Sequence, residues 1–290
     1  MKKTLTIITL LTSILTADSV TINSLGEIDS VVKHSEGKAF LGDQLHGIKS
    51  KSPFGTELPN WITTEALSKL IAPNESMSCN TLLGLKPWRK KEHTYVAIGC
   101  YADGKIDEKD KPYCGSFDNN NFVYLSVLKH ENNSTKLLSS VADIKIQTSW
   151  KNSQLQSGLE DFWDYPQRYI KFDFAPYKLT KTSYAFGLRV GWAESYSGGG
   201  AHFEALVLVV QQGKKLVVVF SEPMYSFVNI AGKWHEDSTR EHDISEEKNI
   251  VIVQKQMTNG YYNLKVKGLD SKFSKIFVFD KKKNRYVAKK

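Results

Sequence analysis

The chain has 290 residues, of which 41% are hydrophobic and 24% are charged, and its formal net charge is +8. Beyond an apolar run at the N-terminus, no stretch approaches the roughly 18 consecutive apolar residues of a membrane-spanning helix, so we expect no transmembrane segment in the mature protein. The basic balance fits ordinary solubility charge better than a dedicated basic site, and any partner that it attracts is expected to be anionic, such as peptidoglycan, lipid headgroups or acidic glycans. We expect no nucleic-acid partner.

The N-terminus has the three parts of a secretory signal. Lys2 and Lys3 precede an apolar run from Leu5 to Leu15, and the small residue Ala17 follows it. This order predicts a signal peptide over residues 1–17 and a periplasmic or secreted protein. The mature chain would have 273 residues (290 minus 17) and a charge of +6, because the signal removes two lysines and no acid.

The first part of the mature chain is expected to hold little regular structure. Residues 18–60 form an irregular, polar lead-in, in which only the stretch 19–22 has the pattern of a short strand. A short helix is predicted over 63–71, because Thr63 or Thr64 can cap it, its apolar residues share one face, and Pro73 follows it. A second helical turn is expected over 78–85.

From residue 93 onward the apolar pattern has a period of two, which is typical of strands with one buried face. The segments 202–210 and 215–220 are apolar on both faces, so they are expected in the centre of a sheet. The pattern predicts a mainly β fold, as an antiparallel meander, a sandwich or an open barrel, with one or two short N-terminal helices. Residues 61–290 would form one β-rich domain or two packed halves, 61–150 and 151–290. Strands are expected over 93–101, 121–129, 142–150, 168–175, 183–195, 202–210, 215–220, 249–257, 261–268, 275–280 and 285–288.

Three cysteines, Cys79, Cys100 and Cys114, lie close together in the sequence. In an oxidising compartment we expect one disulfide, Cys79–Cys100 as the first choice and Cys100–Cys114 as the second. The chain has no C-x-x-C pair of the kind that binds zinc, and we expect neither a metal nor a cofactor.

Two segments carry candidate site residues. The stretch SGGGAH, with Ser197, Gly199 and His202, lacks the spacing of a nucleophile elbow or a phosphate loop, so a hairpin turn is predicted there. We expect positive φ at Gly199 and little effect of His202→Ala on the fold. The stretch KWHEDSTREHD holds His235 and His242 among carboxylates, and a solvated loop is favoured over a zinc or acid–base site because the H-x6-H spacing fits no ligand pattern.

The candidate binding residues also include three aromatic side chains, Trp163, Tyr165 and Trp234, since exposed aromatic rings often grip glycans and protein partners. The favoured hypothesis is an exported, non-enzymatic envelope protein that binds a macromolecule, either an envelope polymer or an enzyme or toxin that it restrains. The alternative is a periplasmic hydrolase that uses His202, His235 and His242.

Overall fold

The computed structural model describes residues 19–46, 53–104, 114, 121–150, 153, 155 and 165–289; the predicted signal peptide lies outside them. The fold is mainly β, as the sequence predicts, with thirteen strands in the described residues joined into one open and mostly antiparallel sheet. The strands are β1 (Val20–Ile22), β2 (Asn80–Pro87), β3 (Thr94–Tyr101), β4 (Phe122–Glu131), β5 (Ser134–Val141), β6 (Arg168–Lys178), β7 (Tyr184–Tyr196), β8 (Gly199–Gln212), β9 (Lys215–Trp234), β10 (Arg240–Thr258), β11 (Tyr261–Gly268), β12 (Ser274–Asp280) and β13 (Arg285–Ala288). The helices are α1 (Ile28–Val31), α2 (Ser35–His46) and α3 (Thr64–Ile71), with 3-10 turns η1 (Leu25–Glu27) and η2 (Met77–Cys79).

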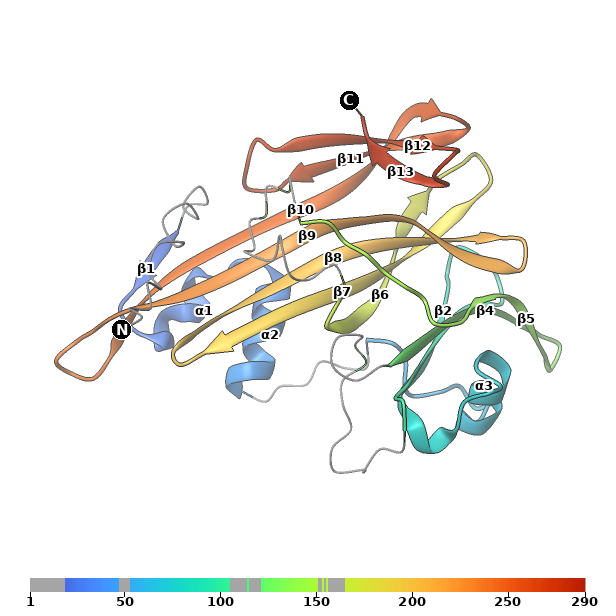
Figure 1. Cartoon of the computed structure of the whole chain (residues 1–290), viewed down its shortest axis with the longest axis horizontal. Helices are drawn as coiled ribbons and strands as arrows, with labels where there is room; N and C mark the ends of the chain where they lie inside the picture. The colour runs from blue at the N-terminus through green and yellow to red at the C-terminus, as the bar shows by residue number, and fades with distance from the viewer. Residues whose placement is uncertain are drawn as a thin grey trace, which may run out of the picture.

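The long strands β7 to β10 form the middle of the molecule (Figure 1). Strand β8 is buried on both faces because its apolar residues run without alternation. On one face Phe203 and Val207 pack against β3 and β4 of the N-terminal layer. On the opposite face Leu206 and Leu208 pack against the C-terminal strands. The central strands are therefore covered on both sides.

Strand β10 belongs to two parts of the sheet. Its first half pairs with β9, from Arg240 to Lys248, and its second half pairs with β11, from Asn249 to Thr258. The meander β11–β13 thereby lies over one face of β8 and β9, where Phe277 and Phe279 join their core. The helices α1 and α2 lie toward the end of the long strands that is further from the meander (Figure 1).

The N-terminal layer consists of β2–β5 with α3 on its outer side. The predicted helix is confirmed: the Thr63 side chain accepts a hydrogen bond from the Ala66 N–H at 3.2 Å, and Leu67 and Ile71 are buried against the layer. The layer joins the central strands through a single parallel pair, Ser140 with Lys215.

Three local predictions are corrected by the structure. The lead-in 18–60 contains the predicted short strand as β1, but it also contains the helices α1 and α2. Contacts with the distant strand β10 hold this helical segment in place. The segment 78–85 is not helical; it is η2 followed by β2. Over 142–150 alternate residues are buried as expected, yet the segment pairs with no strand, and the strand of this region is β5.

The disulfide joins Cys100 to Cys114, so the first-choice pairing of Cys79 with Cys100 is wrong. The reason is the direction of the side chains. Cys100 points into the core between the N-terminal layer and the central strands, where Cys114 also lies. Cys79 packs on the opposite side of that layer, near α3, and is a free thiol.

Candidate functional site

The predicted hairpin at SGGGAH is confirmed: it joins β7 to β8, with Tyr196 paired to Gly199. Positive φ is found at Gly198 (86°), which occupies the turn, so the prediction of positive φ at Gly199 is wrong. Gly199 is needed for another reason, since a side chain there would run into the ring of Tyr196 and approach the Asn229 carbonyl oxygen at 2.7 Å. The hairpin β9–β10 lies beside it, and both turns are at the same end of the long strands (Figure 1).

Two aromatic side chains stand exposed on these neighbouring hairpins. Tyr196 is 55% exposed and Trp234 is 67% exposed. Arg240 ties the hairpins together: its Nη1 donates to the Ser197 carbonyl at 3.3 Å, and its guanidinium lies 5.2 Å from the centre of the Trp234 ring. We call these four residues, Tyr196, Ser197, Trp234 and Arg240, the tip surface.

Backbone contacts fix the position of Tyr196. Its hydroxyl donates to the Asn229 carbonyl at 3.3 Å and accepts from the Ala231 N–H at 3.1 Å, so the ring is anchored by a strand of the neighbouring hairpin. An exposed ring that is already held in place loses little conformational freedom when a partner covers it. The tip surface is thus preorganised for contact.

The surroundings of the tip surface are acidic. Five carboxylates lie on the two hairpin ends, against two cations apart from histidine. The carboxylates are Glu194, Glu236, Asp237, Glu241 and Asp243, and the cations are Lys233 and Arg240. The positive charge of the whole chain therefore does not come from this end.

His202 lies in the interior, at 3% exposure. Arg168 Nη2 is 2.9 Å from His202 Nδ1, and Glu204 Oε1 is 3.1 Å from Nε2. Because a guanidinium only donates, Nδ1 must accept, so the neutral ring carries its proton on Nε2 and donates it to Glu204. Burial lowers the pKa of His202, although the hydrogen bond to Glu204 opposes this effect. Phe40 of α2 stacks on the ring at 4.7 Å, which closes the imidazole off from solvent.

The same face of the sheet binds the start of α2 and the residues before it through further polar and charged contacts, and among the charged residues of these contacts only Glu36 is buried. The Glu246 carboxylate accepts from the Tyr225 hydroxyl at 2.8 Å and from the Lys33 N–H at 2.7 Å. Lys248 pairs with Glu36 at 2.7 Å. Burial alone raises the pKa of Glu36, but the hydrogen bond and the charge of Lys248 outweigh it and hold the pKa at about 2. These polar residues fasten α2 to the sheet.

The three histidines of the hydrolase hypothesis lie apart. His202 is opposite Phe227 on β9, and His235 follows the end of that strand, eight residues after Phe227, which corresponds to at most about 26 Å of extended chain. His242 is opposite Ala231, about 13 Å along β9 from Phe227, and hydrogen-bonds to the Asn229 side chain at 2.8 Å. Burial lowers the pKa of His242.

The remaining predicted residues lie elsewhere. Tyr165 is 43% exposed, and its carbonyl accepts a hydrogen bond from the indole of Trp192 at 2.8 Å, four residues before Tyr196 on β7, so Tyr165 is not part of the tip surface. Trp163 lies outside the described residues. Within the part of the chain that the structure describes, no three His, Cys, Asp or Glu side chains are grouped to hold a metal ion.

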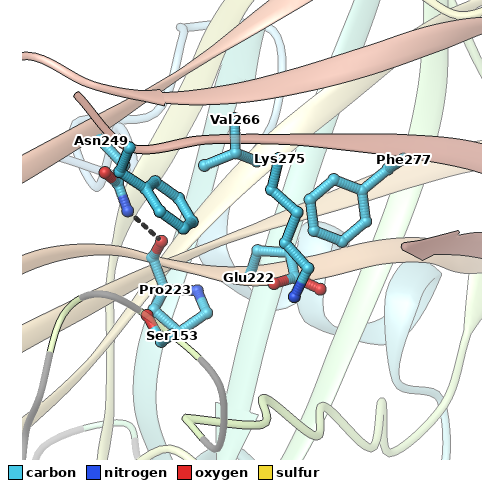
Figure 2. A pocket seen from close by; sticks show the side chains of 8 residues that line it. Ser153, Glu222, Pro223, Asn249, Val266, Lys275 and Phe277 are labelled. Carbon is cyan, nitrogen blue, oxygen red and sulfur yellow. Dashed lines mark hydrogen bonds between the residues drawn. The ribbon is translucent and has the colours of Figure 1, made fainter. Parts of the chain in front are cut away.

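A small pocket lies between β9 and the C-terminal meander. Figure 2 shows Glu222 and Lys275 side by side in it, and the Asn249 amide donating to the Pro223 carbonyl at 3.4 Å. Its volume of about 10 Å³ leaves room for roughly one water molecule. Burial raises the pKa of Glu222 to about 7, while the charges of Lys275 and Arg285 act in the opposite direction. The pocket holds a titrating group but is too small for an organic ligand.

These observations define a mainly β protein with one disulfide, a helix fastened over buried charges and an exposed aromatic surface at its hairpin tips. Comparison with protein-family models, curated proteins and solved structures finds no significant match to this chain. Of the helices in the described residues, none has the length and apolar character needed to cross a membrane.

Proposed function

We propose that this is an exported, non-enzymatic protein of the bacterial envelope that binds a macromolecular partner through its tip surface. The single observation that carries the proposal is the pair of exposed and anchored aromatic rings, Tyr196 and Trp234, on adjacent hairpins. Export itself rests on the predicted signal peptide.

A protein partner is favoured at this surface over an envelope polymer. Tyrosine, tryptophan and arginine most often dominate the binding energy of protein interfaces. The tip surface has one of each: Tyr196, Trp234 and Arg240. The five carboxylates around them would attract a basic partner and repel an acidic one. The expected partner is therefore an electropositive protein, which fits an enzyme or toxin that this chain restrains.

The hydrolase alternative is less favoured for a geometric reason. Its three histidines occupy separate places, and the ring of His202 is enclosed between Phe40, Arg168 and Glu204. A catalytic base must come within hydrogen-bond reach of a substrate proton, and this ring would first need α2 to leave.

The test begins with affinity capture from envelope extract by the mature protein, followed by titration of the purified captured protein. Trp234→Ala and Tyr196→Ala should each weaken binding about 30-fold, because loss of a central interface aromatic costs about 2 kcal/mol. Tyr165→Ala is the matched control, since Tyr165 is an exposed tyrosine that makes none of the contacts of the tip surface, and it should bind like the wild type.

Two results would contradict the proposal. One is a captured protein that binds the wild type and Trp234→Ala with equal affinity. The other is capture of purified peptidoglycan with loss in Trp234→Ala, which would assign the tip surface to a polymer instead of a protein.

A further inference from the structure

The positive charge of the chain is concentrated in its last thirty residues. Residues 261–290 contain ten Lys and Arg and two Asp, a balance of +8, whereas the whole mature chain is expected to carry +6. This segment is the meander β11–β13 with its turns, which lies along one side of the molecule (Figure 1). The rest of the mature protein is thus slightly acidic.

Few opposing charges offset this basic segment. Its two acids are already engaged: Asp270 contacts His34 Nε2 at 2.8 Å, and Asp280 accepts the backbone N–H groups of Lys282 and Lys283. Lys281, Lys282 and Lys283 are exposed together in the turn between β12 and β13, and Arg285 is exposed just after it. The local field is therefore strongly positive.

The outer face of this sheet combines charge with one exposed aliphatic side chain and several half-buried ones. Leu264 and Phe277 are paired and buried in the core, so their neighbours along each strand point outward. The outward positions include Ile252, which pairs with Lys265, and Ile276, which pairs with Lys265 from the other side. Ile252 is 40% exposed. Val278 and Val287 form the next pair of the same face.

We propose that the outer face of β10–β13 docks the protein onto an anionic lipid surface. Clustered lysines are attracted to acidic headgroups, and the attraction grows with each basic residue near the membrane. A soluble anionic polymer could satisfy the lysines, but it offers no hydrocarbon to Ile252 and its aliphatic neighbours. The combination of both kinds of side chain on one face selects the lipid surface.

This docking goes beyond the proposed function and uses a different surface. Ile252 is twelve residues along β10 from Arg240 of the tip surface, which corresponds to roughly 40 Å of strand. A protein held on a membrane by its C-terminal meander would keep its hairpin tips available. The two proposals can therefore fail independently.

The test measures sedimentation of the mature protein with vesicles. Vesicles of phosphatidylcholine with about a third phosphatidylglycerol should bind it, pure phosphatidylcholine vesicles should not, and added salt should weaken binding. The triple variant Lys281→Glu, Lys282→Glu, Lys283→Glu should lose at least tenfold in partitioning. The matched control is Lys38→Glu, Lys69→Glu, Lys90→Glu, which changes the net charge equally at exposed positions outside the meander and should bind at least tenfold more than the first triple variant.

Ile252→Ser separates a lipid from a polymer. It should reduce vesicle binding several-fold while leaving any binding to soluble polyphosphate unchanged. The proposal is overturned if both triple variants lose binding equally, if neutral vesicles bind as well as anionic ones, or if the wild type binds no vesicles. Wild-type binding to polyphosphate that matches vesicle binding, with no effect of Ile252→Ser on either, would assign the face to an anionic polymer. Circular dichroism of each variant checks that it is folded.

Discussion

The carboxyl of Glu222 makes the stability of this protein depend on pH in a way that one substitution should remove. Glu222 lies on the face of β9 that the C-terminal meander covers, and burial raises its pKa from 4.5 to about 7 against the opposing charges of Lys275 and Arg285 (Figure 2). Glu222→Gln keeps the shape of the side chain and takes away the charge.

The sign follows from proton binding. Between pH 4.5 and about 7 the native state holds a proton on Glu222 that the unfolded state has lost, so the contribution of this group to stability is lost as the pH rises through about 7. With a pKa difference of 2.5, ionisation of Glu222 lowers the free energy of unfolding by about 3 kcal/mol at pH 8. At pH 5 the same effect is less than about 1 kcal/mol. The advantage of Glu222→Gln over the wild type should therefore grow by about 2.5 kcal/mol from pH 5 to pH 8.

Urea unfolding followed by tryptophan fluorescence at pH 5 and pH 8 measures this difference. Other titrating groups, including His202, contribute equally to both proteins and cancel in the comparison. Glu57→Gln, which changes an exposed carboxylate, is the control and should differ little from the wild type at either pH. An advantage of Glu222→Gln that is the same at both pH values would refute the reasoning, because it would mean that the buried carboxyl does not titrate in this range.

The remaining predictions concern the buried imidazole, the hairpin and the thiols. His202→Ala should lower the free energy of unfolding by about 3 kcal/mol, because the buried Glu204 carboxylate would lose its hydrogen-bond donor. A loss below about 1 kcal/mol in a melting experiment would contradict this. Gly199→Val should lower the melting temperature and also weaken partner binding by displacing the Tyr196 ring, and unchanged values of both would speak against it. Reduction of the Cys100–Cys114 disulfide should cost about 3 kcal/mol, whereas Cys79→Ser should cost little, and peptide mapping after alkylation should find a single labelled thiol at Cys79.

Much of the β architecture could be predicted because its signal is local. Alternation of apolar residues marks one buried face, and the doubly apolar segment 202–210 correctly marked a central strand. The helix α3 was predictable from its cap and its apolar face. At 142–150 the same alternation predicted correctly which residues are buried, but the predicted strand does not form. The pattern of apolar side chains indicates burial, and it does not indicate whether another strand lies alongside to form backbone hydrogen bonds.

The interior polar contacts could not be predicted, since they join residues far apart in sequence. His202 follows three glycines and looked like part of a surface turn, yet β8 begins at Gly199 and carries the ring into the interior, where α2 covers it. This burial is the reason that we now expect His202→Ala to destabilise the fold, instead of leaving it nearly intact. The sequence of α2 has little amphipathic pattern, so the helix was not predicted. Charged contacts such as Glu36 with Lys248 hold it in place, and these join residues that are far apart in the sequence.

The pairing of β1 with β10 sets an order of events in folding. Thr21 bonds to Asp243, 222 residues away, and the Lys33 N–H bonds to Glu246, 213 residues away. The segment from β1 to the start of α2 thus has no docking site until nearly the last strands have emerged and paired. Contacts of such high sequence separation slow folding, because a long loop must close before any of them forms. Because a chain is synthesised from its N-terminus, this segment would therefore emerge first and find its place in the structure last.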